Sequence, residues 1–205
     1  MADKKRRFWD VREYFKSDDA NAVDKYGLTK IFEAAQKNKI GLVKELIADG
    51  ADINFQFKRV ADPGMSLNPF SSEPEFSEGS TPLHVAVVYG SISSMKVLME
   101  RGADLNRQDL DGCTPLDRAL EKYNKLDEEI LLVSDVDKGT KETQKKMKEH
   151  SLYRVISKLL ARNGGESKVF RMSEKLQAEI VSDKDIADFT EPARKKRRFP
   201  RIRFE

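Results

Sequence analysis

The sequence predicts an all-α protein built as a helical solenoid, in which short helix pairs stack side by side. The first reason is an internal repeat, because the same pattern of residues returns at fixed intervals. The second is composition: hydrophobic residues make up 39% and charged residues 36% of 205 residues, and no apolar run approaches the roughly 20 residues that span a bilayer. The third is the presence of one cysteine and two histidines, which exclude an internal disulfide and leave little material for a metal site.

The repeated pattern occupies three segments, namely 24–54, 79–106 and 109–165. The interval from Thr29 to Gly50 is 21 residues, and so is the interval from Thr81 to Gly102. In the second unit, the threonine hydroxyl suits an N-cap, and the following Pro82 suits the first helical position. The glycine at the end suits the left-handed backbone that terminates a helix. Each unit therefore predicts two helices and a turn, and its apolar face needs a neighbouring unit to cover it.

The motifs TPLH at 81–84 and GADLN at 102–106 resemble the ankyrin repeat. This resemblance implies a non-catalytic module that binds proteins through hairpin fingertips and the concave face of the first helices. It also implies that His84 is a scaffold residue that hydrogen-bonds neighbouring loops. The first unit departs from the pattern, with Lys30 and Phe32 in place of the proline and the histidine, so we expect a degenerate terminal repeat there. Between the two helices, Asn38 stands where the repeat pattern usually has a glycine, and asparagine can adopt the left-handed backbone conformation of that position.

Residues 1–23 form a basic N-terminus followed by a predicted N-capping helix. Phe8, Val11 and Phe15 recur at helical spacing behind the cluster Lys4–Arg7. A helix that covers the first repeat is the simpler interpretation, and a detachable aromatic docking motif is the alternative.

Two insertions interrupt the repeats, at 55–78 and at 125–150. The first is rich in proline and serine, yet it contains four phenylalanines, whereas disordered loops are usually poor in aromatic residues. It either packs on the repeats or offers apolar anchors to a partner. The second predicts two elongated antiparallel helices with an acidic and a basic limb, which either pair with each other or form a platform for a partner. We expect His150, which lies among lysines, to be solvated.

The C-terminal region predicts a capping helix within 166–190, starting at Ser173, and then a basic flexible tail at 191–205. Within the tail, residues 192–205 have a local charge of +6, although the net charge of the whole chain is only +3. Its run of five basic residues resembles a nuclear import signal: Arg194, Lys195, Lys196, Arg197 and Arg198. The alternatives are contact with nucleic acid or anionic lipid, a role in solubility alone, or another sorting signal.

The sequence predicts no catalytic residue, no cofactor and no metal ligand. Cys113 has no identifiable base partner, so we expect an exposed fingertip thiol rather than a nucleophile. We expect a monomer inside a cell, in the nucleus or the cytoplasm. A protein delivered into a host cell would suit this composition equally well.

The leading functional prediction is an adaptor or regulator that binds a protein partner, and an import receptor is a further expected partner of the tail. A nuclear nucleic-acid-associated or chromatin-associated adaptor that uses the tail is the alternative. The positions that the ankyrin resemblance assigns to partner binding, together with two aromatic residues of the first insertion, are Tyr26, Leu28, Gln36, Lys37, Phe70, Phe76, Val88, Tyr89, Leu110, Asp111 and Cys113.

Overall fold

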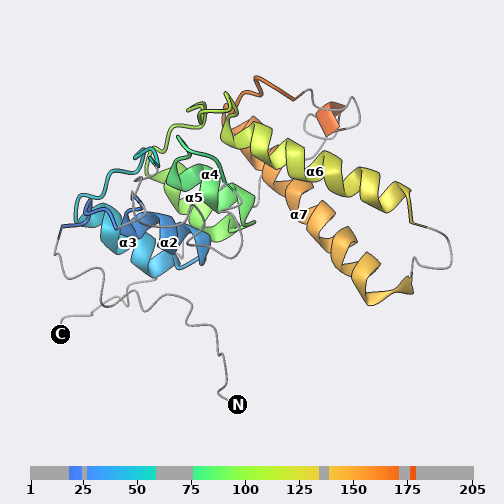
Figure 1. The fold of residues 1–205 in the computed structure, drawn as a ribbon, viewed down its shortest axis with the longest axis horizontal. Coiled ribbons are helices and arrows are strands. Elements are labelled where there is room, and N and C mark those ends of the chain that lie inside the picture. The colour runs from blue at the N-terminus through green and yellow to red at the C-terminus, as the bar shows by residue number, and fades with distance from the viewer. Residues whose placement is uncertain (1–18, 25–26, 59–75, 134–138, 171–175, 179–205) are drawn as a thin grey trace, which may run out of the picture.

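The computed structural model describes residues 19–24, 27–58, 76–133, 139–170 and 176–178. Within these residues the regular structure is helical, apart from one isolated β-bridge between Val23 and Thr29. Residues 176–178 are also helical. The longer helices, shown in Figure 1, are α2 (Lys30–Gln36), α3 (Ile40–Ala48), α4 (Pro82–Val88), α5 (Ile92–Glu100), α6 (Pro115–Leu131) and α7 (Lys141–Arg162).

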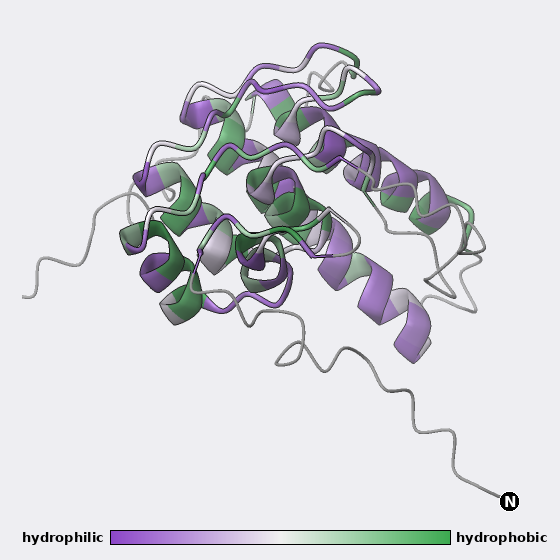
Figure 2. Ribbon diagram, turned by 60° about the vertical axis from the view of Figure 1, so that its left-hand side comes forward, coloured by the Kyte–Doolittle hydropathy of each residue, from purple (hydrophilic) through white to green (hydrophobic). Residues whose placement is uncertain are grey.

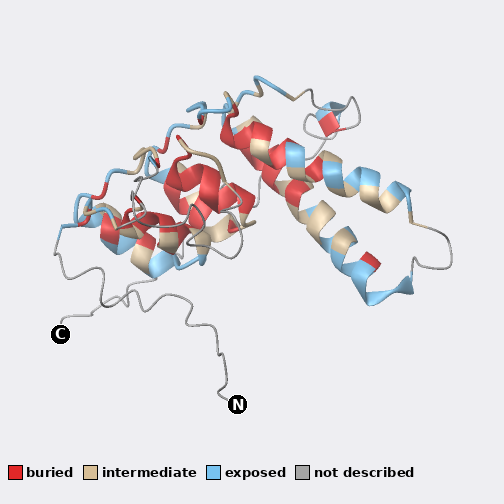
Figure 3. Cartoon of the chain, viewed as in Figure 1, coloured by how far each residue is buried: buried red, intermediate tan, exposed pale blue. Residues whose placement is uncertain are grey.

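The helices form three pairs that stack in the order of the chain. Helix α4 packs between α2 and α6, while α3 packs against α5, and each helix also contacts the other member of its own pair. Figure 3 shows that the buried residues concentrate in α2, in α4 and in the adjoining parts of α6 and α7. No residue of α4 is exposed, because α4 has a neighbouring pair on both sides.

The second pair confirms the prediction made for its first turn. Thr81 caps α4, and its hydroxyl accepts a hydrogen bond from the backbone N–H of His84. In return, Nδ1 of His84 accepts a hydrogen bond from the backbone N–H of Thr81 at 3.1 Å. Nε2 of His84 lies 3.1 Å from the carbonyl oxygen of Cys113, at the start of the third repeat. Burial lowers the pKa of His84, so a neutral ring that links two repeats, as a scaffold residue, fits this site.

Asparagine side chains join the turns of successive repeats. The side-chain oxygens of Asn54 and Asn106 accept backbone N–H bonds from the next turn, at 2.8 and 2.7 Å. The side-chain oxygen of Asn21 likewise accepts the backbone N–H of Asp52 at 2.7 Å. A carboxylate oxygen of Asp19 accepts the backbone N–H of Asn21, just as one of Asp52 accepts the backbone N–H of Asn54. Residues 19–21 therefore make the same turn-to-turn contacts as the turns at 52–54 and 104–106. This similarity was not expected, because the D-x-N triplet alone is too short a signal.

The first repeat replaces the polar link of His84 with aromatic packing. Phe32 occupies the equivalent position, and its ring centroid lies 6.1 Å from that of Phe55 and 6.5 Å from that of Phe76. The carbonyl of Ser80, equivalent to that of Cys113, accepts a hydrogen bond from the backbone N–H of Phe57 at 2.9 Å. The carbonyl of Ser80 thus receives its hydrogen bond from the backbone that follows the first repeat, whereas the ring of His84 in the second repeat contacts the equivalent carbonyl of Cys113.

The third pair is longer than the others and projects from the stack. Helices α6 and α7 have 17 and 22 residues, compared with 7 and 9 residues for α4 and α5. Their far ends extend beyond the other helices in Figure 1, and the outer turns of α7 are mainly hydrophilic in Figure 2. Lys146 of α7 forms an ion pair with Glu129 of α6 at 3.0 Å.

The expectation that His150 is merely solvated is wrong. Its ring stacks on Tyr123 with centroids 4.4 Å apart, and its Nε2 lies 3.3 Å from a carboxylate oxygen of Asp127. Since the two helices bring these three side chains together, the ring of His150 lies between α6 and α7 rather than in solvent.

Asp117 closes the third repeat at the position equivalent to His84. Its buried carboxylate accepts hydrogen bonds from the hydroxyl of Ser167 and from backbone N–H groups of 168–170. Leu176 is also buried in the hydrophobic core. The proposed start of the capping helix at Ser173, and the segment 179–190, lie outside the described residues, as does the predicted N-capping helix at 8–15.

Candidate protein-binding surface

The residues assigned to partner binding lie in different environments. Three of them are exposed, namely Lys37, Leu110 and Asp111. Leu28, Gln36, Phe76 and Tyr89 are half-buried. Val88 and Cys113 are buried. The positions outside the described residues are Tyr26, Phe70 and the basic run Arg194–Arg198.

Cys113 is not the exposed fingertip thiol that the sequence analysis expected. Its exposed fraction is 4%, because the third fingertip closes around it. Its backbone N–H donates to a carboxylate oxygen of Asp109 at 3.0 Å, and its carbonyl faces His84. Burial raises the pKa of the Cys113 thiol to about 11, so the thiol is protonated at neutral pH.

Val88 is also inaccessible, with an exposed fraction of 2%. Its carbonyl oxygen accepts a hydrogen bond from the Tyr153 hydroxyl at 2.5 Å. This contact repeats the one made by Ser91, whose hydroxyl donates to the carbonyl of Gln36 at 3.0 Å. Val88 therefore joins the second and third repeats, and a partner could not reach it.

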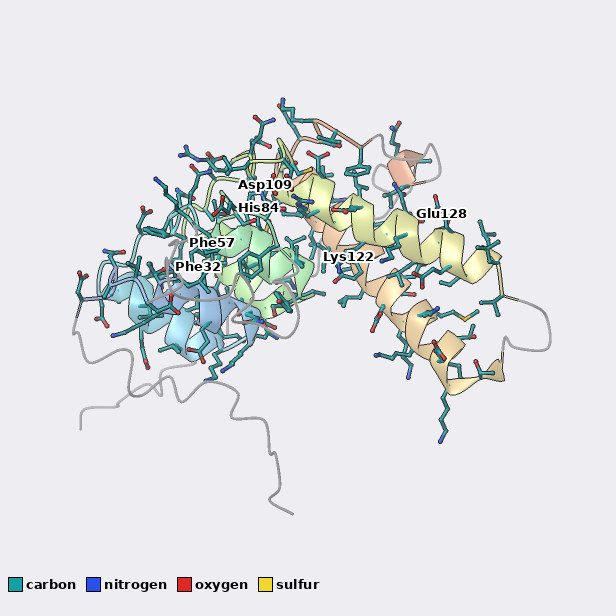
Figure 4. The ribbon with its side chains drawn as sticks, viewed as in Figure 1. Phe32, Phe57, His84, Asp109, Lys122 and Glu128 are labelled. Atoms are coloured by element: carbon teal, nitrogen blue, oxygen red, sulfur yellow. The ribbon has the colours of Figure 1, made fainter. Side chains whose placement is uncertain are left out.

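Phe76 and Tyr89, two of the assigned residues, come together on the second repeat. Their ring centroids lie 6.4 Å apart in an edge-to-face arrangement. Phe57 lies 5.5 Å from Phe76, and Figure 4 shows Phe57 beside Phe32. These rings place both ends of the first insertion against the repeats, while residues 59–75 lie outside the description. Because Phe76 and Tyr89 remain half-buried, part of this aromatic surface faces solvent.

The third fingertip, residues 107–113, is held by Arg118 of α6. The guanidinium contacts carboxylate oxygens of Asp109 at 2.7 Å, Asp111 at 2.5 Å and Glu121 at 3.0 Å. It also donates to the hydroxyl of Ser77 at 2.9 Å. Arg118 was not among the expected site residues, and the spacing of opposite charges at 118 and 121 is the only sequence signal for its role.

This cluster favours the ionised form of Asp111. A hydrogen bond from Ser77, followed by one from Arg118, lowers the pKa of Asp111 below its ordinary value. Asp109 is buried, and its other oxygen accepts the backbone N–H groups of Asp111 and Cys113. Figure 4 shows Asp109 next to His84, so the cluster continues the hydrogen-bonded link between the second and third repeats. The fingertip is therefore fixed in position by several charged contacts.

Leu110 lies at the tip of this finger, with an exposed fraction of 74%. Its backbone N–H donates to the carbonyl of Glu78 at 2.9 Å. Gly79 adopts a φ of 79°, and a Cβ there would lie 2.8 Å from the backbone nitrogen of Leu110. The second and third fingertips thus pack closely, and the leucine side chain extends from a fixed backbone.

The described residues contain no group of three or more His, Cys, Asp or Glu side chains arranged to hold a metal ion. In the same part of the chain, every helix is too short or too polar to cross a bilayer.

Comparison with known proteins gives the same repeat. A family model described as ankyrin repeats (many copies) matches residues 76–119. An ankyrin repeat-containing protein of Schizosaccharomyces pombe is 55% identical over 55 residues, which are 27% of this chain and 24% of that protein. Rabankyrin-5 of Mus musculus is 30% identical over 104 residues, 51% of this chain and 8% of its own length. The potassium channel AKT1 of Arabidopsis thaliana is 32% identical over 101 residues, 49% of this chain and 9% of its own length.

The matches to these relatives thus span between 8% and 24% of the relatives' own lengths. What is shared is the repeat region, where the family model covers Phe76, all of α4 and α5, and the start of α6. The helix pairs, the Thr81–His84 contacts and the asparagine-linked turns lie in or beside that region. This chain therefore contains ankyrin repeats, which the family model places at residues 76–119.

Proposed function

We propose that this chain is a non-catalytic protein–protein interaction module, acting as an adaptor or regulator. Its partner would bind along the fingertips, the concave face of the first helices and the insertion at 55–78. The observation that carries this proposal is the contact between Phe76 and Tyr89, which leaves two aromatic rings half-exposed beside the second fingertip. Aromatic side chains of this kind contribute much of the binding energy at protein interfaces.

The proposal assigns different roles to the parts of the chain. Segment 24–165 would bind the partner, with 1–23 and 166–190 covering its two ends and 191–205 serving as a basic tail. We place the protein inside a cell, in the nucleus or cytoplasm, as a monomer. A host-directed effector fits the same assignment. The projecting pair α6 and α7 would act mainly as a rigid extension, since its helices already form ion pairs with each other.

Affinity capture from eukaryotic lysate tests this function, using the full chain after nuclease treatment at roughly physiological salt. Tyr89→Ala and Phe76→Ala remove the two rings, and Met147→Ala is the control because Met147 lies on the projecting α7. We expect one protein partner to be retained by the control and lost from both ring variants, with thermal unfolding used to check that each variant is folded. Equal capture by all four proteins would contradict the proposal.

The alternative function uses the basic tail, in which residues 192–205 carry a local charge of +6 that favours contact with nucleic acid. In this case the repeats would hold a nuclear protein while residues 194–198 bind nucleic acid or an import receptor. Replacing these five basic residues with glutamine separates the two functions. Binding that disappears with the charges and falls steeply between low and physiological salt would favour the tail, whereas binding that persists would favour the repeats.

A further inference from the structure

The third fingertip presents an apolar side chain on a backbone that is already ordered. The backbone of Leu110 is hydrogen-bonded to Glu78, and the adjacent Asp109 and Asp111 are both held by Arg118. Ordering a loop on binding normally reduces affinity, because conformational freedom is lost. That loss is small here, so the 74% exposed side chain of Leu110 is a ready anchor for a partner.

The surroundings of Leu110 carry an excess of negative charge. One guanidinium, that of Arg118, serves three carboxylates: Asp109, Asp111 and Glu121. The second carboxylate oxygens of Asp111 and Glu121 accept no hydrogen bond from the described part of the chain. Both side chains are about half exposed, at 56% and 47%. The nearby Arg107 donates to the neutral amide of Gln56 at 2.7 Å, so its charge reduces the excess to one negative charge over these five side chains.

We propose that the third fingertip binds a protein segment in which an apolar side chain is flanked by arginine or lysine. The apolar side chain would contact Leu110, and the basic side chains would pair with the open oxygens of Asp111 and Glu121. Charge complementarity of this kind selects partners and accelerates their association. This inference rests on the proposed function, since it names the chemistry of a partner for the same interaction surface.

The test uses the full chain with leucine methyl groups labelled for NMR, and three synthetic peptides of eight residues. The first alternates arginine and leucine, the second alternates arginine and serine, and the third alternates glutamate and leucine. Leu110→Ser removes the anchor, and Leu131→Ser is its matched control because Leu131 is 77% exposed on the projecting α6. Neither side chain is buried, so both variants should fold.

We expect the arginine–leucine peptide to shift the methyl signals of Leu110 and not those of Leu131. Leu110→Ser should weaken its binding about tenfold, and Asp111→Asn a few-fold, while Leu131→Ser should leave it unchanged. The other two peptides should bind at least about tenfold more weakly. No binding, equal binding of the arginine–serine peptide, or an unchanged dissociation constant for Leu110→Ser would overturn the inference.

The capture experiment separates this inference from the proposed function. If a partner is captured through Phe76 and Tyr89 but the peptide results are negative, the function stands and the partner has another chemistry. If capture also fails, the interaction function itself is contradicted.

Discussion

At one equivalent position, the first repeat buries an aromatic side chain and the third repeat buries a carboxylate. This position is the third residue of the first helix, and it holds Phe32 in the first repeat, His84 in the second and Asp117 in the third. Each side chain is buried, but each faces a different neighbour. Phe32 packs against aromatic rings of the insertion, whereas Asp117 accepts the backbone N–H groups of 168–170. The comparison shows that the next segment of chain determines which residue suits the position.

The difference follows from where the hydrogen-bond donors lie. Between the first and second repeats, the backbone N–H of Phe57 already satisfies the carbonyl of Ser80, so no polar side chain is needed at Phe32. After the third repeat, several backbone N–H groups turn inward and need an acceptor. A buried carboxylate is stable in such a place because these donors compensate for its lost hydration.

Removing the aromatic ring should have the largest effect. Phe32 is 2% exposed and contacts both Phe55 and Phe76, so Phe32→Ala leaves a cavity beneath the ends of the insertion. We expect the free energy of unfolding, measured with urea and circular dichroism, to fall by about 3–5 kcal/mol. Phe55→Ala is the control, because Phe55 is half-buried and its loss should be smaller. Equal losses of stability in the two variants would show that the buried Phe32 contributes no more to the aromatic cluster than the half-buried Phe55.

The buried carboxylate should give the next largest effect, and it should depend on pH. Burial alone would raise the pKa of Asp117, but hydrogen bonds from Ser167, Thr114, Lys168 and Phe170 outweigh it and lower the pKa from 3.8 to about 2. Because the folded pKa is the lower one, this stabilisation is complete above pH ~4–5 and disappears as pH falls from 3.8 through about 2. It amounts to about 2 kcal/mol.

The measurement is urea unfolding of the wild type and of Asp117→Asn between pH 2 and 7. The amide cannot ionise and accepts fewer hydrogen bonds, so this variant should be destabilised at pH 7 and should lose less stability on acidification. If the two proteins show parallel pH profiles, other carboxylates dominate the acid response.

Contacts between residues that are close in the sequence could be predicted, whereas contacts between distant segments could not. The Thr81 cap, the left-handed Asn38 and the scaffold role of His84 were all expected, because the repeat motif carries them within a few residues. The Arg118 cluster was not, since it joins a fingertip, a helix and Ser77, which lies 41 residues away.

Two of the incorrect expectations have a related cause. Cys113 occupies a turn position that is usually variable, but its backbone is hydrogen-bonded on both sides, and this buries the thiol. His150 follows a run of lysines, but the return of α7 along α6 brings its ring onto Tyr123. In both cases the environment depends on a second segment of chain, which local composition does not reveal.

The smallest predicted effect concerns how the second and third repeats are joined. The Ser91 hydroxyl in the second repeat donates to the carbonyl of Gln36 in the first. The Tyr153 hydroxyl, on a longer side chain in the third repeat, makes the equivalent bond to the carbonyl of Val88 in the second. Tyr153→Phe keeps the packed ring but leaves the buried carbonyl of Val88 without this donor, so we expect a loss of about 1 kcal/mol. Ser151→Ala is the control, because its hydroxyl bonds only within α7 and is exposed, and its effect should stay within about 0.5 kcal/mol. Urea unfolding measures both changes. If Tyr153→Phe is destabilised no more than the control, packing of the ring joins the two repeats, and the hydrogen bond to Val88 does not contribute to stability.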